Sequence, residues 1–295
     1  MTEEQTPNRI LPILRTQRAD TQSLRLLEQL SEVFGQVPAV ACDNRTGDFD
    51  GPAPRYLPLN AKTLTDYGVT DPPDNWGWLC GDFCYYAAIH RYPGYDLYLL
   101  VENDVFMDDA GARLLSERLT RTKAQAIAAR LRHQPEVPAP RYSRPLRKIG
   151  YDAHVGCLFP LTAASPSLIR AMRAVRLKAL AKNAAINDEA AFSTAVFETG
   201  VAFQTLETLL TPHISEEHLR TNPPYLLEAV ERDPETPLFR HPAIPLALVL
   251  ERIRTGERNY HARRLREILG TANSAELQHI ETALRTRAAH VQDHG

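Results

Sequence analysis

The sequence predicts an α/β protein, in which a mixed β-sheet is flanked by helices and followed by a helical extension at the C-terminus. Short apolar runs alternate with amphipathic helical patterns over residues 1–243, and such alternation is typical of a sheet covered by helices. From Ile244 onward the pattern is helical and charged. A chain of 295 residues can form one large domain with an appendage. We therefore expect a main domain over residues 1–243 and a helical extension over residues 244–295.

The composition is that of an ordinary soluble protein, with 43% apolar and 24% charged residues. The formal charge of -2 gives no global electrostatic reason to expect a nucleic-acid partner. The first residues are polar and acidic, and no run of about 18 apolar residues occurs. We expect no signal peptide, no transmembrane segment and a cytoplasmic location, while peripheral contact with a membrane stays open.

The N-terminal part of the chain predicts a βαβ unit. The run Arg9–Leu14 predicts a first strand and Val37–Cys42 a second. Between them, apolar residues at helical spacing over Leu26–Phe34 predict a helix, with Ser23 as the N-cap and Gly35 after its last turn. Because such a unit joins parallel strands, the two carboxyl ends should lie at one edge of the sheet.

The later elements continue the alternation of strands and helices. A stretch rich in proline over residues 135–145 predicts an extended surface loop. The other expected elements are a helix starting near Asp82, a strand over Tyr95–Val101, a helix over Ala110–Leu131 in which residues 124–129 could instead form a weak strand, a strand over Gly156–Pro160, a helix opened by Ser165 and Pro166, a helix over Ala190–Phe197 ended by Gly200, and a strand over Val201–Leu206.

An acidic motif ends the strand predicted at Tyr95–Val101. Glu102 and Asp104 follow directly, with Asp108 and Asp109 close behind. Carboxylates at positions i and i+2 of an extended segment leave it on the same side. Like charges at such proximity repel each other unless a cation or a basic group lies between them, or unless one acid is partly protonated. We interpret the motif as an oxygen-rich site for a divalent cation.

Charged residues also follow the first two predicted strands, where an open α/β sheet binds its ligands. Arginines there can neutralise phosphate charge while carboxylates hold a bridging cation, a combination that suits a metal-bound diphosphate. Neither a Walker A loop nor a G-x-G-x-x-G motif occurs in the chain, which argues against a P-loop NTPase and a dinucleotide-binding Rossmann domain. The residues in question are Arg15, Thr16, Arg18, Asp43, Asn44 and Arg45.

Several residues with a candidate function also have a structural explanation. Asp82 and Asp188 each precede a helical segment and could be its N-cap. A single histidine such as His241, between an arginine and a proline, is usually a surface or packed residue. Trp76 and Trp78 could stack on a base or a sugar ring, but aromatic residues beside an apolar strand are more often part of the core.

The cysteines and the C-terminal arginines have structural explanations as well. Cys80 and Cys84, with His90 nearby, lack the second close pair that a zinc site needs, so we expect buried reduced thiols. The basic residues of the C-terminal helices are interleaved with glutamates and predict a solvated helical face. These basic residues are Arg252, Arg254, Arg258, Arg263, Arg264 and Arg266.

Taken together, the order of these features resembles that of the GT-A glycosyltransferases. The features are the early βαβ unit, an aromatic-rich helix preceded by Gly81 and Asp82, the strand that ends in Glu102-Asn103-Asp104, the later Asn187-Asp188-Glu189 and the final His241-Pro242. The resemblance covers residues 9–243 and leaves the terminal helices uncovered. The first acid of the motif is Glu102, where the family pattern has aspartate.

The resemblance implies a GT-A-like, Rossmann-like fold and a hexosyltransferase-like activity that needs Mn²⁺ or Mg²⁺. The expected donor is a nucleotide-diphosphate-sugar, a UDP-sugar in the first place, and the acceptor is a hydroxyl of a glycan or another molecule. A metal-dependent phosphoester or diphosphate hydrolase, or a nucleotide-sugar-binding protein without catalysis, would be compatible with the same acids. Product analysis separates the hydrolase from the transferase, because added acceptor speeds release of the nucleoside diphosphate only in a transferase. The activity of an Asp188 substitution discriminates the binding protein.

The resemblance also assigns expected roles to residues of this chain. It implies a DxD-like metal site made of Glu102, Asp104 and His241, with Glu102 as a ligand or a ribose contact. It implies that Asp188 deprotonates the acceptor hydroxyl, with Glu189 as the substitute candidate. By the resemblance, the donor nucleotide would contact Asp43 and Asp82. The position of the strand ends adds Arg15, Thr16, Arg18 and Arg45 as expected contacts.

Overall fold

The computed structural model describes residues 6–45, 49–133, 143–151, 155–233, 238–256 and 262–293. The chain divides into two compact units, which are described separately below. The sheet unit comprises Met1–Asn103 and Asp109–Pro212, and the C-terminal unit comprises Asp104–Asp108 and His213–Gly295. The boundary predicted between residues 243 and 244 therefore falls inside the C-terminal unit.

The sheet unit is built on a seven-stranded sheet with the order β3-β2-β1-β4-β7-β6-β8. Strand pairs β1-β2, β2-β3, β1-β4 and β6-β8 are parallel, whereas β7 runs antiparallel to both β4 and β6. The predicted α/β class with a mixed sheet is thus confirmed. The strands are β1 Ile10–Thr16, β2 Ala39–Asp43, β3 Tyr56–Leu59, β4 Leu97–Glu102, β6 Ala126–His133, β7 Val155–Ala164 and β8 Phe203–Thr205.

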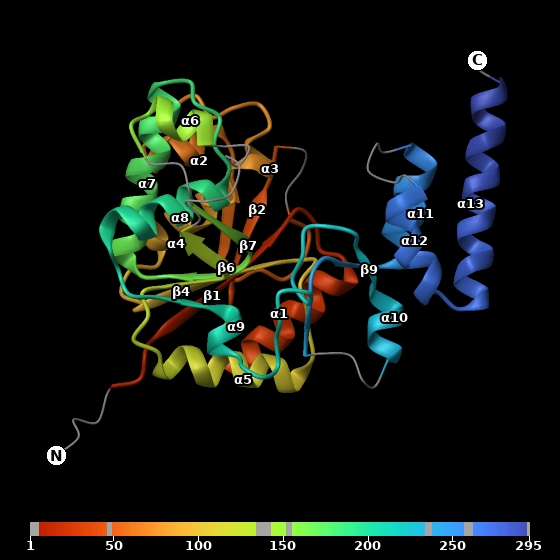
Figure 1. The fold of residues 1–295 in the computed structure, drawn as a ribbon, viewed down its shortest axis with the longest axis horizontal. Coiled ribbons are helices and arrows are strands. Elements are labelled where there is room, and N and C mark those ends of the chain that lie inside the picture. Colours follow the sequence, from red (N-terminus) through yellow and green to blue (C-terminus); the bar gives the residue numbers. More distant parts are fainter. Residues whose placement is uncertain are drawn as a thin grey trace. The chain divides into compact units, whose positions relative to one another are not determined.

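Helices cover both faces of this sheet (Figure 1). Helices α1 and α5 pack against each other on one face, while α4, α7 and α8 cover the other. Leu11 and Ile13 of β1 face the second group, because they share a buried cluster with residues of α4, α7 and α8. The helices of this unit are α1 Thr21–Phe34, α2 Ala61–Asp66, α3 Trp76–Leu79, α4 Phe83–Arg91, α5 Asp109–Arg121, α6 Ser143–Lys148, α7 Pro166–Ala181, α8 Asp188–Thr199 and α9 Leu206–Leu209.

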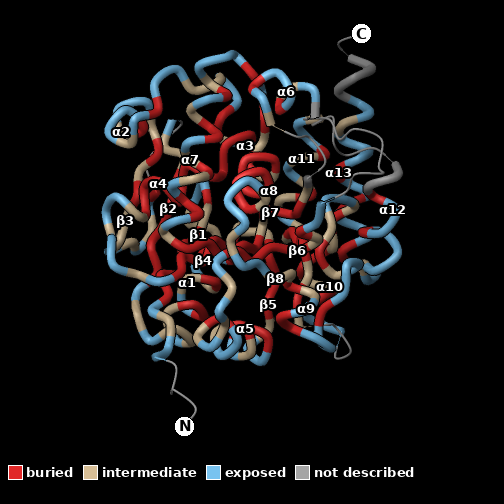
Figure 2. Tube along the Cα trace, turned by 60° about the vertical axis from the view of Figure 1, so that its left-hand side comes forward, coloured by how far each residue is buried: buried red, intermediate tan, exposed pale blue. Residues whose placement is uncertain are grey.

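The central strands carry continuous apolar runs because both faces of the sheet are covered. Figure 2 shows the buried strands grouped at the centre, with exposed segments around them. Five consecutive residues of β4, Leu97–Val101, are buried, and burial changes only at Glu102. The transition from a buried strand to a partly exposed acid therefore lies where the sequence predicts it.

Some predicted boundaries and caps differ from the structure. The N-cap of α1 is Asp20, whose carboxylate accepts the Ser23 N–H, so the prediction of Ser23 was wrong. Gly35 ends α1 in the left-handed conformation, as predicted, at φ 61°. Residues 124–129 belong mainly to β6 rather than to a long helix. Pro145 lies inside α6, and the rest of the proline-rich stretch, up to residue 142, lies outside the described residues.

The C-terminal unit combines short strand pairs with helices. Strand β5 (Phe106–Met107) pairs antiparallel with β10 (Phe239–Arg240), and β9 (Tyr225–Leu226) pairs in parallel with β11 (Ala243–Ile244). The first of these pairings brings the segment after Asp104 beside the segment before His241. The helices are α10 Leu227–Arg232, α11 Leu246–Thr255, α12 Ala262–Thr271 and α13 Ser274–Asp293.

The predicted helical character of the C-terminal region is confirmed. Val249 and Ile253 of α11 share a buried cluster with Ile268 of α12 and Ile280 of α13. None of the described helices combines the length and the apolar character that crossing a bilayer requires.

Candidate active site

The candidate site begins at the reversal of strand order in the sheet. Strand β1 lies between β2 and β4 and is parallel to both, so the three carboxyl ends share one edge of the sheet. Arg15 is the register partner of Glu102 across β1 and β4. In open α/β sheets such a reversal opens the crevice in which ligands bind. The fold thus collects Arg15, Asp43 and Glu102 at one edge, as the sequence predicts.

Arg15 is the charged centre of this edge. Its Nη1 contacts Glu102 Oε1 and lies 3.4 Å from Asp188 Oδ2, and its Nη2 donates to the Gly77 carbonyl at 2.7 Å. Burial alone would lower the pKa of the guanidinium, but the nearby acids, Glu102 foremost, raise it above its ordinary value. Arg15 is therefore a fixed cation that links the end of β4 to the start of α8.

Asp188 is the first residue of α8 but does not cap it. The cap is Asn187, whose side-chain oxygen accepts the Ala190 N–H at 2.9 Å, so the capping explanation for Asp188 was wrong. Asp188 Oδ2 instead accepts the Gly81 N–H at 3.0 Å, and its Oδ1 accepts the Glu189 N–H at 2.9 Å. Its carboxylate is thereby directed at the edge of the sheet where Arg15 lies.

The electrostatic environment of Asp188 suits proton transfer. Burial raises the pKa of Asp188 to about 7, with Arg15 opposing the shift and Glu102 adding to it. The side chain is 10% exposed. A carboxyl group whose pKa lies near neutrality can take a proton efficiently at physiological pH, which is the property of a general base.

Two glycines allow the charged groups to approach the backbone. A Cβ atom at Gly77 would lie 2.1 Å from Asp43 Oδ2, and one at Gly81 would lie 2.2 Å from Arg15 Nη1 and 2.6 Å from Asp188 Oδ2. A Cβ atom at either position would therefore displace these charged groups from their present places. This role of the two glycines was not predicted, although a pair of glycines around a short tryptophan-containing segment was a visible signal.

Asp43, at the end of β2, is paired with Arg45. The Arg45 Nε donates to Asp43 Oδ1 at 2.8 Å, and the guanidinium lies 4.4 Å from the centroid of the Trp76 ring. Trp76 is buried as expected, whereas Trp78 is 65% exposed, so the expectation of a core position was wrong for Trp78. Gly77 is a neighbour of both groups, because its carbonyl accepts from Arg15 and a Cβ atom on it would meet Asp43.

Asp82 occupies the N-cap position of α4, but within the described residues its side chain makes no capping hydrogen bond. Its carboxylate is fully buried and accepts from Arg176 Nη2 at 2.7 Å, from Arg176 Nε at 2.9 Å and from the Tyr86 hydroxyl at 2.5 Å. Arg176 also donates to the Ile186 carbonyl at 2.6 Å, just before Asn187. In this geometry Asp82 is a positioning residue that holds α4, α7 and the start of α8 together, and a direct contact with a nucleotide is not supported.

Three other predicted residues lie at the borders of the site. Thr16 is buried, and its hydroxyl donates to the Arg18 carbonyl at 2.9 Å, so its side chain holds the turn after β1. Arg18 lies 3.5 Å from Asp20 and is half-exposed. The Glu189 carboxylate accepts from the Asn187 amide at 2.8 Å.

Asp104 and His241 lie together in the C-terminal unit. The His241 Nε2 is 3.4 Å from Asp104 Oδ1, and its Nδ1 is 2.7 Å from the Arg220 carbonyl. A carbonyl oxygen can only accept, so Nδ1 carries a proton and Nε2 presents its lone pair toward Asp104 when the imidazole is neutral. Metal-binding histidines are commonly oriented by such a bond from the other ring nitrogen.

Within the C-terminal unit, Asp104 and His241 could both be ligands of a metal ion. Only Asn103 separates Glu102 from Asp104, so chain connectivity alone keeps the two carboxylates close to each other. Two carboxylates and one imidazole are ligands that Mg²⁺ or Mn²⁺ accepts in proteins. The residues present therefore fit the expected ion.

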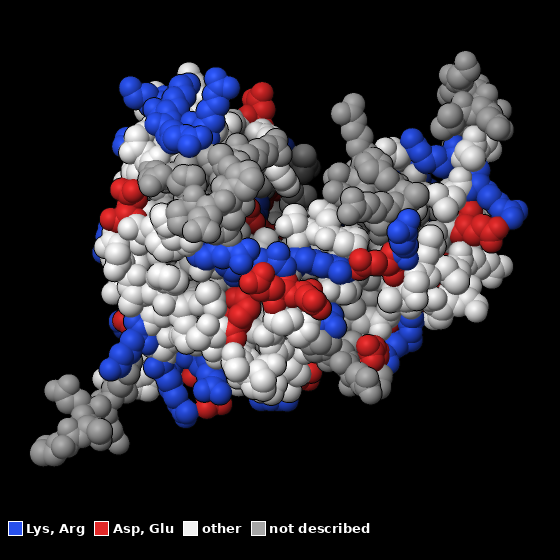
Figure 3. All heavy atoms as spheres, viewed as in Figure 1, with Lys and Arg blue, Asp and Glu red and all other residues white. Residues whose placement is uncertain are grey.

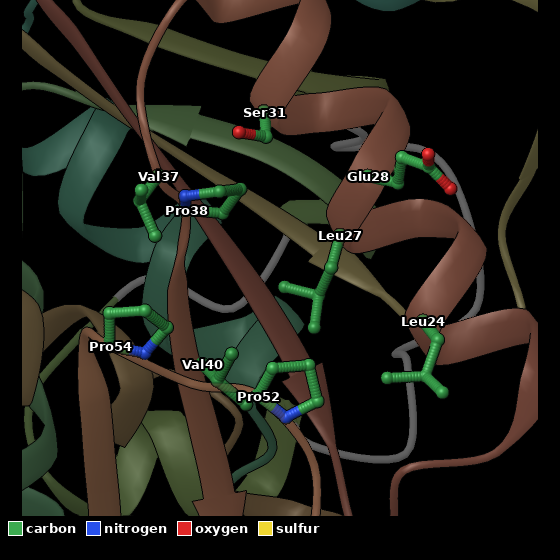
Figure 4. A pocket seen from close by; sticks show the side chains of 9 residues that line it. All are labelled: Leu24, Leu27, Glu28, Ser31, Val37, Pro38, Val40, Pro52 and Pro54. Carbon is green, nitrogen blue, oxygen red and sulfur yellow. The ribbon is translucent and has the colours of Figure 1, made fainter.

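Two further features of the molecular surface are a basic cluster and an apolar pocket. On the face that Figure 3 draws, both charge signs are interspersed, except for a basic cluster where Figure 1 places α6. In the sheet unit, an apolar pocket of about 350 Å³ lies between α1 and β2, where Leu27, Val40 and Pro52 face one another (Figure 4). None of the predicted site residues lines that pocket. All four cysteines are buried and free, as expected.

Comparison with known proteins gives distant structural likenesses. No family model matches the chain, and no curated protein matches it in sequence. A glycosyltransferase involved in the glycosylation of the major capsid of PBCV-1 is similar at a TM-score of 0.38 and 10% identity, over 79% of this chain and 91% of that one. The inositol-1-phosphate CTP transferase from T. maritima is similar at a TM-score of 0.30 and 10% identity, over 68% and 85%. Likeness at this level does not assign an activity to this chain.

Proposed function

We propose that this protein is a metal-dependent glycosyltransferase that moves a sugar from a nucleotide-diphosphate-sugar to an acceptor hydroxyl. The observation that carries the proposal is the pairing of His241 with Asp104 directly after the acidic end of β4. The imidazole is held by the Arg220 carbonyl with its Nε2 toward the carboxylate. In this proposal Glu102, Asp104 and His241 bind Mn²⁺ or Mg²⁺.

The bound ion would neutralise the charge that develops on the leaving diphosphate. Asp43 and Arg45 are proposed to contact the donor nucleotide, because their ion pair lies at the carboxyl end of β2 beside the Trp76 ring. Arg18 is half-exposed at the end of β1 and would add positive charge near the phosphates. A UDP-sugar is the donor that we expect first.

Asp188 is proposed to deprotonate the acceptor hydroxyl. Its pKa of about 7 follows from burial, so an appreciable fraction is ionised at neutral pH and can take a proton. Arg15 fixes the carboxylate and keeps part of it ionised, since it lies 3.4 Å from Asp188 Oδ2. Direct displacement with this base would invert the anomeric configuration. Glu189 is the substitute base in the proposal.

The proposed activity can be tested in two steps. A thermal-shift panel of nucleotides and nucleotide-sugars, with and without Mn²⁺, should identify a donor whose binding raises the melting temperature only with the ion. Release of nucleoside diphosphate from that donor is then followed with and without a panel of acceptors. Faster release with an acceptor supports a transferase, whereas release that no acceptor changes supports a hydrolase. A donor that binds without any turnover supports a binding protein.

A further inference from the structure

The C-terminal unit contains a small cavity to which the proposed function assigns no role. Its volume is about 140 Å³. Its wall includes Asp104, which is also one of the proposed metal ligands, and Arg252 of α11. Its other lining residues are Thr221, Asn222, Pro224, Pro242 and Ile244.

The size of this cavity limits what it can hold. A water molecule takes up about 30 Å³ in the liquid, so about 140 Å³ accommodates a group of a few heavy atoms. Pockets that enclose a whole drug-sized ligand start at about 300 Å³. The cavity therefore has room for a single phosphate group.

The chemistry of the wall points in the same direction. The Arg252 guanidinium is always charged and offers several donors in one plane, which suits phosphate oxygens. Thr221 and Asn222, whose side chains carry a hydroxyl and an amide, line the same wall. The Asp104 carboxylate repels an anion, and a divalent cation on that carboxylate would offset the repulsion. An anion should hence enter this cavity together with a divalent cation.

We infer that this cavity binds one phosphate group of the leaving diphosphate and that Arg252 contacts this phosphate group. The inference rests on the proposed function, because it takes Asp104 as a metal ligand. It assigns a binding role to an arginine that the sequence pattern predicts to be part of a solvated helical face. Arg254 lies on the same helix and is exposed, and it is absent from the cavity wall, so it serves as a matched control.

Isothermal titration calorimetry with inorganic pyrophosphate tests the inference without a nucleoside. Mn²⁺ alone is titrated first, and pyrophosphate is then titrated at a fixed Mn²⁺ concentration. Arg252→Gln should weaken pyrophosphate binding by at least about tenfold, the loss expected for one charge-assisted hydrogen bond. Mn²⁺ binding should stay unchanged. Arg254→Gln should bind pyrophosphate like the wild type, and Arg252→Lys should keep part of the affinity because it keeps the charge.

The outcomes separate this inference from the proposed function. Equal pyrophosphate affinity in the wild type and in Arg252→Gln overturns the inference, as does Mn²⁺ binding by the wild type without any pyrophosphate binding. Both results leave the metal site intact. Absence of Mn²⁺ binding in the wild type overturns the inference and the metal-dependent function together. Melting temperatures of all variants show whether a loss of affinity reflects a loss of fold.

Discussion

Asp188 combines a buried position with contacts to a cation and to a backbone N–H, and its protonation controls the predicted activity. Because its pKa is raised to about 7, the ionised form that acts as base is reached only as the pH rises through about 7. We expect the transfer rate of the wild type to rise with pH over this range and then level off. Asp188→Asn should remove most of the turnover while the fold is kept. Pre-steady-state rates from pH 5.5 to 8.5 measure this, and near-normal transfer by the variant would move the role of base to Glu189.

The same shift predicts how stability depends on pH. The folded-state pKa of Asp188 lies above the unfolded value of about 3.9, so the folded state binds the proton more tightly. The stabilisation of the folded state by protonated Asp188 is complete below pH about 4 and is lost as the pH rises through about 7. Asp188→Asn should therefore gain stability relative to the wild type between these limits. Urea unfolding of both proteins in EDTA tests this, and a constant difference across the range would contradict the raised pKa.

Gly81 is the glycine whose replacement should affect the site most directly. A methyl group there would collide with Arg15 and Asp188, at 2.2 Å and 2.6 Å. Gly81→Ala should cost about 1–3 kcal/mol of unfolding free energy through overpacking and should lower turnover as well. The control is Gly270→Ala, where nothing lies within 4 Å of the added Cβ. This control should be neutral or gain up to about 1 kcal/mol from helix propensity. Equal changes of the unfolding free energy and of turnover in Gly81→Ala and Gly270→Ala would contradict overpacking at Gly81.

At the scale of elements, the buried ion pair between Asp82 and Arg176 fixes how α4, α7 and the start of α8 meet. Breaking such a pair leaves an uncompensated buried charge. Asp82→Asn should therefore lower the unfolding free energy by about 3–5 kcal/mol. Asp96→Asn, in a pair with Arg9 whose side chains are 48% and 70% exposed, should change it by about 1 kcal/mol or less. Unfolding in guanidinium chloride measures the unfolding free energy of both variants. A small loss of unfolding free energy in Asp82→Asn, together with weaker nucleotide binding, would restore Asp82 as a nucleotide contact.

The same elements show what a single sequence can specify. The apolar runs predicted β1, β2, β4 and β7 because strands covered on both faces are continuously apolar. In Asn187-Asp188-Glu189 the sequence could not decide the cap, since asparagine and aspartate cap equally well and only the backbone geometry selects Asn187. The contact of Arg15 with Asp188 joins residues that are 173 positions apart. No local pattern encodes such a contact.

At the scale of the whole molecule, the predicted class was correct, but the division of the chain was not visible in the sequence. The short segment Asp104–Asp108 belongs to the C-terminal unit although its neighbours on both sides belong to the sheet unit. Pairing of β5 with β10 explains this, because it attaches the segment to a strand far along the chain. Strands of two residues carry too little periodicity to be predicted. The position of Arg252 in one cavity wall with Asp104 was missed, whereas the resemblance had already grouped His241 with Asp104.

The measurement that tests the metal-dependent donor site most directly is calorimetry of UDP binding with Mn²⁺ and with EDTA. Three proteins are compared, namely the wild type, Asp104→Asn, and Asp108→Asn as a control that removes a nearby charge outside the proposed ligand set. We predict that the wild type and the control bind UDP only with Mn²⁺ and that Asp104→Asn loses this binding while keeping its melting temperature. Equal UDP affinity of Asp104→Asn and the wild type in the presence of Mn²⁺ would contradict the proposed site.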